Sequence, residues 1–329
     1  SGGLKRSNLL ATQGVTGACV ALFATLMQQG LNKIGLVSPF YTYHLKQIYS
    51  VFGDNHPVHF IDCIEGEEDP SSSSPSTMID FDALENNLLK KGELHCLIIC
   101  NPCNPSTRIW PRSDLDRLVQ LCARYGVILL LDECYCDMVW SNGDEHGRLY
   151  TPLIDPETQS VHSHVVVARG FSKNLGCQSW RVGYAIAHES MVQKMAMAAD
   201  PIYICIPWLQ HPMGKYLREH LTDFQEHLNR VNQLLRANWT VMRDAFVEAL
   251  GWEAIEPEGT MYGLFRHGKS SDMEAVQDAL EKGVGVTPCN IFYPGTPKNT
   301  GLIRIHCGIS EEKAKLIAQL LLSSGSSNK

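Results

Sequence analysis

The stretch Val165-Val166-Val167-Ala168-Arg169-Gly170-Phe171-Ser172-Lys173-Asn174-Leu175-Gly176 carries the central pattern of this 329-residue chain. Its apolar run predicts a buried strand, and the glycine-flanked turn that follows delivers Lys173 to the end of that strand. Arg181 comes eight residues later. A lysine that is fixed, partly desolvated and close to a second cation can lose its proton and attack an aldehyde. Other stretches must decide between this interpretation and a solvated surface lysine.

The same alternation of apolar strand and helix occurs repeatedly before Lys173. Strands are expected at 33–37, 58–63, 95–100, 127–131 and 165–168. This pattern predicts an α/β fold with a doubly wound, mostly parallel sheet that is covered on both faces. Ligands of such sheets bind beyond the carboxyl ends of the strands.

Polar and aromatic residues follow these predicted strand ends. Asp132 ends an entirely apolar run, where a carboxylate is costly to bury without a partner, so it is a functional candidate. Two Asn-Pro pairs make a stiff turn at 101–105. The side chains expected at this edge are Tyr41, Asn104, Asp132, Tyr135 and Lys173.

A further candidate is the Gly14-Val15-Thr16-Gly17 turn, which precedes an apolar helical pattern. The free N–H groups of a helix N-terminus and one hydroxyl can bind an anion there. The alternative is an ordinary helix cap, which is the commoner use of such a turn.

The chain is expected to form two domains. Residues 1–235 would form the large domain, and residues 236–329 would form a smaller α+β C-terminal domain. The region 214–250 reads as one long helix, with or without a break, and the boundary is placed inside it near Arg236. The acidic, serine-rich stretch 65–77 is expected to be an exposed loop.

The composition excludes several classes of protein. The chain is 44% hydrophobic and 19% charged, with a net charge of −7 and no basic run, which argues against nucleic-acid binding. No apolar stretch reaches membrane-spanning length. The twelve cysteines are scattered through apolar runs, so reduced thiols, a cytoplasmic location and no metal site are expected.

Taken together, these motifs resemble the class I/II aminotransferase family of fold-type I pyridoxal-phosphate (PLP) enzymes. The resemblance is carried by Asn-Pro-Cys-Asn-Pro at 101–105, Asp-Glu-Cys-Tyr at 132–135, Phe-Ser-Lys-Asn-Leu-Gly at 171–176, Trp-Arg-Val-Gly-Tyr at 180–184 and Ile-Arg-Ile at 303–305. It implies an aspartate-aminotransferase-like fold and PLP as the cofactor.

The resemblance also implies a role for each candidate. Lys173 would form the Schiff base with PLP and later move the proton, and Asp132 would pair with the pyridinium nitrogen. Asn104 and Tyr135 would bond the phenolic oxygen of the ring. The other implied cofactor contacts are the ring stacking of Tyr41, Ser172 in the lysine turn, and the phosphate contacts of Gly14, Val15, Thr16 and Arg181. Arg304, with Asn104, would bind the substrate carboxylate.

The sequence departs from the family pattern at several positions. Gly170 stands where the family usually has a phosphate-binding hydroxyl, Ser106-Thr107 replaces Thr-Gly, and Pro288-Cys289 replaces a common Pro-Gly. Family members also normally carry an N-terminal segment before the phosphate turn. These departures suggest a divergent branch with altered phosphate anchoring.

The resemblance predicts a homodimer that transfers an amino group from an α-amino acid to a 2-oxo acid. The same residues also serve aminocyclopropane-carboxylate-synthase-like elimination and the oxidation or cyclisation chemistry of arginine-processing relatives, so these alternatives stay open. A PLP-sensing regulatory module would need a basic DNA-binding helix, and a pseudoenzyme would not need an intact set of Lys173, Asp132, Tyr135 and Arg304. The sequence does not identify the donor or the acceptor.

Overall fold

The computed structural model describes residues 3–64, 77–140, 149–203, 205 and 207–323. The predicted loop at 65–77 therefore lies almost wholly outside the described residues. The chain forms two compact units. The first comprises residues 1–101, 110–136 and 149–219, and the second comprises residues 102–109, 137–148 and 220–329.

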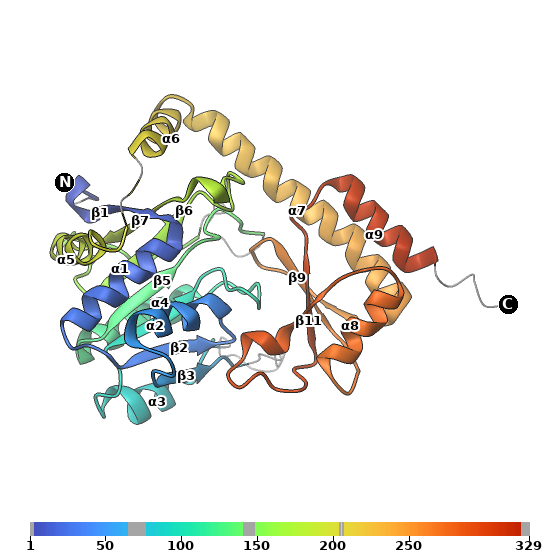
Figure 1. Ribbon diagram of the computed structural model, residues 1–329, viewed down its shortest axis with the longest axis horizontal. Helices are drawn as coiled ribbons and strands as arrows, with labels where there is room; N and C mark the ends of the chain where they lie inside the picture. Colours follow the sequence, from blue (N-terminus) through green and yellow to red (C-terminus); the bar gives the residue numbers. More distant parts are fainter. Residues whose placement is uncertain (1–2, 65–76, 141–148, 204, 206, 324–329) are drawn as a thin grey trace. The chain divides into compact units, whose positions relative to one another are not determined.

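The first unit is built on a seven-stranded sheet (Figure 1). Its strand order is β1-β7-β6-β5-β4-β2-β3, and the bounds are β1 (Leu9–Gln13), β2 (Ile34–Ser38), β3 (Val58–Asp62), β4 (Cys96–Cys100), β5 (Ile128–Asp132), β6 (Val165–Gly170) and β7 (Val182–Ala187). Strands β3, β2, β4, β5 and β6 are parallel, whereas β7 is antiparallel to both β6 and β1. The predicted mostly parallel sheet is confirmed.

Helices cover both faces of this sheet, because its central strands are apolar on both sides. One face packs against α1 (Gly14–Gln28), α2 (Thr42–Phe52) and α5 (Glu189–Ala199). The other packs against α3 (Phe81–Leu84), the π-helical turn η2 (Glu85–Leu89) and α4 (Arg112–Tyr125). Leu129 and Leu131 of β5 belong to this second core, and Leu130 belongs to the first, as the twofold alternation of a strand requires.

The second unit contains a small antiparallel sheet with strand order β10-β11-β9-β8. Its strands are β8 (Glu253–Ile255), β9 (Tyr262–Arg266), β10 (Thr287–Pro288) and β11 (Leu302–His306). The helices of this unit are α7 (Leu221–Leu250), α8 (Asp272–Glu281) and α9 (Glu311–Ser323), with a 3-10 turn, η4 (Cys289–Phe292). The predicted small α+β part of the chain is confirmed.

The long helical region contains a break at His220. Helix α6 (Pro207–Glu219) ends there with the first unit, and α7 begins at Leu221 in the second. The second unit therefore begins earlier in the chain than Arg236 and also includes two earlier segments. A folding boundary near Arg236 stays a prediction.

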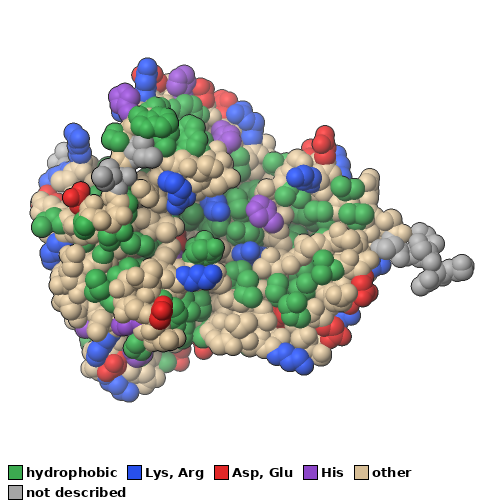
Figure 2. Space-filling view, viewed as in Figure 1, with side chains coloured by type: hydrophobic (Ala, Val, Ile, Leu, Met, Phe, Trp, Pro, Cys, Tyr) green, Lys and Arg blue, Asp and Glu red, His purple; other side chains and the backbone are tan. Residues whose placement is uncertain are grey.

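Charged side chains of both signs are interspersed on the face shown in Figure 2. Among the described residues, no helix has the length and apolar character needed to span a membrane. All twelve cysteines are free thiols.

We expect Gly263→Ala in β9 to destabilise the second unit. An ideal Cβ at Gly263 would lie 2.2 Å from Cζ3 of Trp239, whose ring is buried. Such overpacking typically costs about 1–3 kcal/mol. Gly268→Ala is the matched control, because its Cβ would meet nothing within 4 Å. Chemical unfolding followed by circular dichroism should show a lower midpoint for the first variant only, and equal midpoints would contradict the packing argument.

Candidate active site

Six strands of the first unit bring their carboxyl ends to one edge of the sheet. Strands β3, β2, β4, β5 and β6 are parallel, and β1 runs the same way because β7 is antiparallel to both β1 and β6. Most of the predicted site residues follow these ends, namely Gly14, Val15 and Thr16 after β1, Tyr41 after β2, Asp132 and Tyr135 at β5, and Ser172 and Lys173 after β6. Arg181 directly precedes β7 at the same edge.

Asp132 is the last residue of β5 and is 3% exposed. Its side chain lies on the α1 and α2 face of the sheet, as does that of Leu130. Oδ2 is 2.8 Å from Nε2 of His44, and Oδ1 accepts a hydrogen bond of 3.0 Å from the Cys134 N–H. Both carboxylate oxygens therefore have a partner, which is the condition for burying this group.

His44 is a candidate site residue that the sequence analysis missed. It lies on α2 and is 1% exposed. A signal for it exists in the sequence, because His44, Gln47 and Ile48 share the buried face of this helix. The imidazole holds the Asp132 carboxylate from the side of α2 and fixes its orientation.

The N-terminus of α1 is adapted to an anion. Gly14 has a φ of +67°, and Gln13 provides no side-chain cap for the first N–H groups. The guanidinium of Arg181 donates from Nη2 to the Gln13 carbonyl and from Nη1 to the Gln178 carbonyl, both at 3.0 Å. It approaches so closely that an ideal Cβ at Gly14 would lie 2.6 Å from Nη2. The helix dipole and a fixed cation thus act on the same point.

Gly170 and Gly183 let this end of α1 approach the sheet. The two glycines are paired across β6 and β7. A Cβ at Gly183 would lie 2.6 Å from the backbone of Gly14, and one at Gly170 would lie 3.3 Å from the Val182 carbonyl and 3.5 Å from Val15. The glycine that replaces the usual hydroxyl at 170 therefore occupies a crowded position.

Backbone hydrogen bonds hold the turn that carries Lys173, one to β7 and one within the turn. Phe171 N–H donates to the Val182 carbonyl at 3.2 Å, and Leu175 N–H donates to the Phe171 carbonyl at 3.3 Å. Ser172 and Lys173 are partly exposed between these bonds. The lysine is thus accessible on a fixed turn.

The pKa of the Cys134 thiol is shifted by burial and by three charged side chains nearby. Burial and the Asp132 carboxylate raise the pKa of Cys134 to about 12, and the positive charges of Lys173 and Arg181 act in the opposite direction. Asp132, Lys173 and Arg181 therefore influence one point in the first unit. The thiol itself stays protonated at neutral pH.

Two tyrosines complete this edge. Tyr135 is 5% exposed in the turn after β5. Tyr41 precedes α2 and packs edge-on against His44, with ring centroids 5.5 Å apart. Its other neighbour is the ring of Tyr43, at 5.4 Å.

A buried ion pair ties the ends of β5 and β6 together. Glu133 is fully buried, and its Oε2 accepts from Nη2 of Arg169 at 2.6 Å and from Nε at 2.8 Å. Thr151 donates to the same carboxylate at 2.8 Å and accepts from Arg169 at 2.9 Å. Burial raises the pKa of Glu133, which the Arg169 charge and the Thr151 hydroxyl oppose. The pair fixes Glu133 directly beside Asp132.

The other two predicted residues, Asn104 and Arg304, lie together in the second unit. Nη1 of Arg304 donates to Oδ1 of Asn104 at 2.5 Å, and Asn104 is 2% exposed. The guanidinium lies over the rings of Tyr262 and Phe292, with Cζ 4.0 and 4.6 Å from the ring centroids. Sequence analysis did not identify these two rings. This arrangement holds the guanidinium plane in place and leaves its remaining N–H groups for a carboxylate.

Comparison with known proteins identifies the family of this chain. The family model for aminotransferase class I and II matches residues 3–321. The chain belongs to this aminotransferase family. The aspartate aminotransferase of Sulfurisphaera tokodaii is 22% identical over 318 residues, which cover 94% of this chain and 73% of that relative.

Solved structures of the same fold are also similar to this aminotransferase-family chain. A double mutant of Thermus thermophilus aspartate aminotransferase matches with a TM-score of 0.78 at 18% identity, covering 96% of this chain and 76% of that one. YbdL of Escherichia coli, whose structure is described with a methionine aminotransferase function, also has a TM-score of 0.78, at 20% identity, and the match covers 97% and 77% of the two chains. The predicted family and fold are confirmed.

The residues of this family member fit PLP. The cradle at Gly14, which a Cβ would fill, offers N–H groups and Arg181 to a phosphate. Asp132 offers a carboxylate to a ring nitrogen, and Lys173 offers an amine to an aldehyde. In the described part of the chain, no group of three or more His, Cys, Asp or Glu residues could hold a metal ion.

We expect Gly14→Ala to weaken PLP binding by about tenfold or more. The new Cβ would displace the Arg181 guanidinium, which would then lose its charge-assisted contact with the phosphate. Gly30→Ala is the matched control at the other end of α1. Gly30 has a φ of +71°, but its Cβ would meet nothing within 4 Å. Titration calorimetry with PLP should separate the variants, and equal affinities would refute the phosphate cradle.

Arg169→Met is expected to lower the free energy of unfolding by about 3–5 kcal/mol, because it leaves the Glu133 carboxylate buried without its charge partner. The double variant Glu133→Gln/Arg169→Met should recover part of this loss. The measurement is denaturant unfolding of all the single and double variants. An additive double variant would show that the pair is not coupled.

Proposed function

We propose that this protein is a PLP-dependent aminotransferase that exchanges an amino group between an α-amino acid and a 2-oxo acid. Family membership supports the reaction class, and the site supports the cofactor. The observation that carries the proposal is the shared edge of the sheet, where the Lys173 turn, the Asp132 carboxylate and the Arg181 cradle all lie. PLP, when bound, supplies an electron sink for the electrons of a substrate carbanion.

Asp132 would hold a proton at the ring nitrogen. This role needs a carboxylate in a fixed orientation, which the contacts of His44 and the Cys134 N–H supply.

Lys173 would bind the aldehyde carbon of the cofactor, C4′, and, when released, would take a proton from the substrate α-carbon and return it at C4′, on the other side of the amino nitrogen. Its fixed, partly exposed turn suits a residue that must act at two nearby carbon atoms. Tyr135 would donate its hydroxyl to the phenolic oxygen, and Tyr41 would cover a ring face.

In the second unit, Arg304 would bind the α-carboxylate of the substrate. Asn104 accepts from Nη1 of Arg304 through Oδ1, so its Nδ2 is the donor that would serve the phenolic oxygen. A bidentate guanidinium suits both the amino acid and the 2-oxo acid, because the two substrates share the carboxylate. A homodimer and a cytoplasmic location remain predictions from the resemblance.

The test combines spectroscopy with product analysis. Purified protein loaded with PLP should show a visible absorption band that at least one of the common amino acids removes, with formation of the matching 2-oxo acid. Lys173→Ala should lose the Schiff-base band and all turnover, whereas Lys194→Ala, at an exposed position of α5, should keep both. Oxygen uptake or release of a small leaving group in place of 2-oxo acid conversion would contradict transamination. Failure of the wild type to bind PLP would contradict the cofactor proposal.

A further inference from the structure

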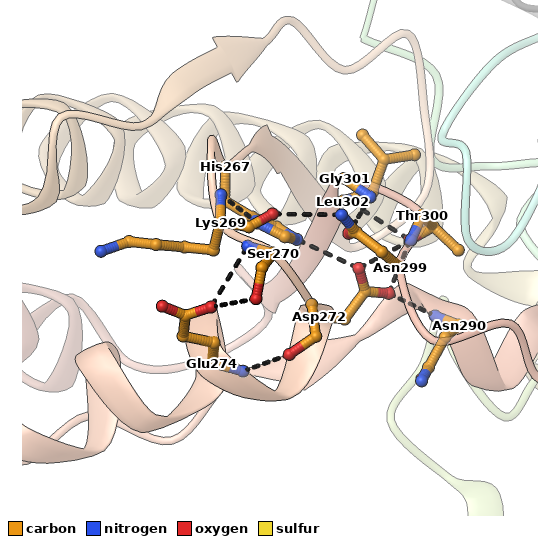
Figure 3. A network of polar contacts seen from close by, with 11 residues as sticks. His267, Lys269, Ser270, Asp272, Glu274, Asn290, Asn299, Thr300, Gly301 and Leu302 are labelled. Carbon is orange, nitrogen blue, oxygen red and sulfur yellow. Dashed lines mark hydrogen bonds and ion pairs between the residues drawn. The ribbon is translucent and has the colours of Figure 1, made fainter.

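Asp272 is a fully buried carboxylate in the second unit that accepts hydrogen bonds from three separate segments (Figure 3). Oδ1 accepts from Nε2 of His267 at 3.1 Å and from the Thr300 N–H at 2.8 Å. Oδ2 accepts from the Asn290 N–H at 2.9 Å and from Oγ1 of Thr300 at 2.6 Å. Four donors thus converge on one side chain at the start of α8.

The neighbouring contacts fix the tautomer of His267. Its Nδ1 accepts a hydrogen bond from the Lys269 N–H at 3.3 Å, so the ring proton is on Nε2 and is donated to Asp272. Since every lone-pair direction of the carboxylate has a donor, the network is satisfied, which makes it rigid.

Two of the three segments carry an aromatic ring that contacts Arg304, and the third leads into the strand that contains Arg304. His267 directly follows β9, which begins at Tyr262, and Asn290 lies in η4 with Phe292. Thr300 precedes β11, and its Oγ1 accepts from the N–H of Leu302, the first residue of that strand. Tyr262 and Phe292 are the two rings against which the Arg304 guanidinium packs.

The network therefore joins the guanidinium and both of its aromatic neighbours to one carboxylate. Burying a charged group costs free energy, which only well-placed hydrogen-bond or charge partners offset. Apolar residues of similar volume often stabilise a buried position equally well. A carboxylate at this position is accordingly better explained by positioning than by stability.

We propose that Asp272 is a positioning residue that holds Arg304 in the orientation needed to bind a substrate carboxylate. The proposal rests on the proposed function, in which Arg304 is the carboxylate ligand. Asp272 does not touch the substrate and acts through the backbone of β11 and η4. Its loss should therefore raise KM much more than it lowers kcat.

The first experiment tests the position of Arg304 without any turnover. Arg304 is labelled with phenylglyoxal, and the rate at this residue is measured by peptide mass spectrometry in wild type, Asp272→Asn and Thr300→Val. A released guanidinium should react severalfold faster in both variants. Thr300→Val is the milder change, and it keeps the test decisive should Asp272→Asn fail to fold. Wild-type labelling rates in folded variants would overturn the proposal.

Two matched controls separate positioning from general loosening. Glu274→Gln changes another carboxylate of α8, which accepts from the N–H and the hydroxyl of Ser270 at 3.2 and 2.7 Å. Among the described residues, the Glu274 side chain makes no hydrogen bond to β11 or η4. Thr300→Ser keeps the hydroxyl that Thr300→Val removes. Both should label Arg304 at the wild-type rate, and faster labelling of Glu274→Gln would attribute the effect to α8 as a whole.

The second experiment measures steady-state kinetics with the amino acid that the wild type accepts. Asp272→Asn and Thr300→Val should raise KM by about ten- to a hundredfold, as expected for a misplaced binding group, with the visible spectrum of bound PLP unchanged. An unchanged KM would contradict the proposal and leave the proposed function standing. A wild type that accepts no amino acid would refute the proposed function, and the Arg304 labelling would still decide the positioning.

Discussion

The first unit depends on the removal of one carboxylate from water. Asp132 ends a strand whose preceding residues are entirely apolar, and a charge at that point would be strongly unfavourable without partners. His44 and a backbone N–H bond it from two sides, and the ion pair of Glu133 with Arg169 stabilises the adjoining residue. Two polar partners thus keep one buried carboxylate oriented, which is typical of a group with a chemical role.

Each unit holds one side chain of ionisable type in a fixed orientation, a carboxylate in the first unit and a guanidinium in the second. In the first unit, the buried Asp132 carboxylate is held by His44 and a backbone N–H. In the second, the Arg304 guanidinium is held by two aromatic faces and one amide. In the proposed function, the first group would meet a ring nitrogen and the second a carboxylate. In both cases the supporting residues absorb the cost of ordering before a ligand arrives, which is how binding sites gain preorganisation.

The sequence was sufficient for the parts of the fold that depend on local periodicity. The apolar runs placed the ends of the central strands to within one or two residues. The strand expected at 127–131 is observed as Ile128–Asp132, and the strand expected at 165–168 is observed as Val165–Gly170. The direction of β7 and the presence of β1 were not predictable in this way, because an apolar run carries no information about its partner strand. Family motifs supplied the candidate residues, whose roles remain predictions. His44, Arg169 and the rings beside Arg304 were missed, since their contacts join residues far apart in the chain, such as the 88 positions between His44 and Asp132.

The contact of Arg181 with the Gln13 carbonyl joins residues 168 positions apart. Lys173 and Arg181 lie on one short connection between adjacent antiparallel strands, so this half of the site forms from local contacts. The other half belongs to β1, which pairs with β7 alone among the strands of the described residues. An anion bound by both Arg181 and the N-terminus of α1 would therefore strengthen the attachment of β1 to the rest of the sheet. By linkage, binding of such an anion would protect β1 and α1 from proteolysis.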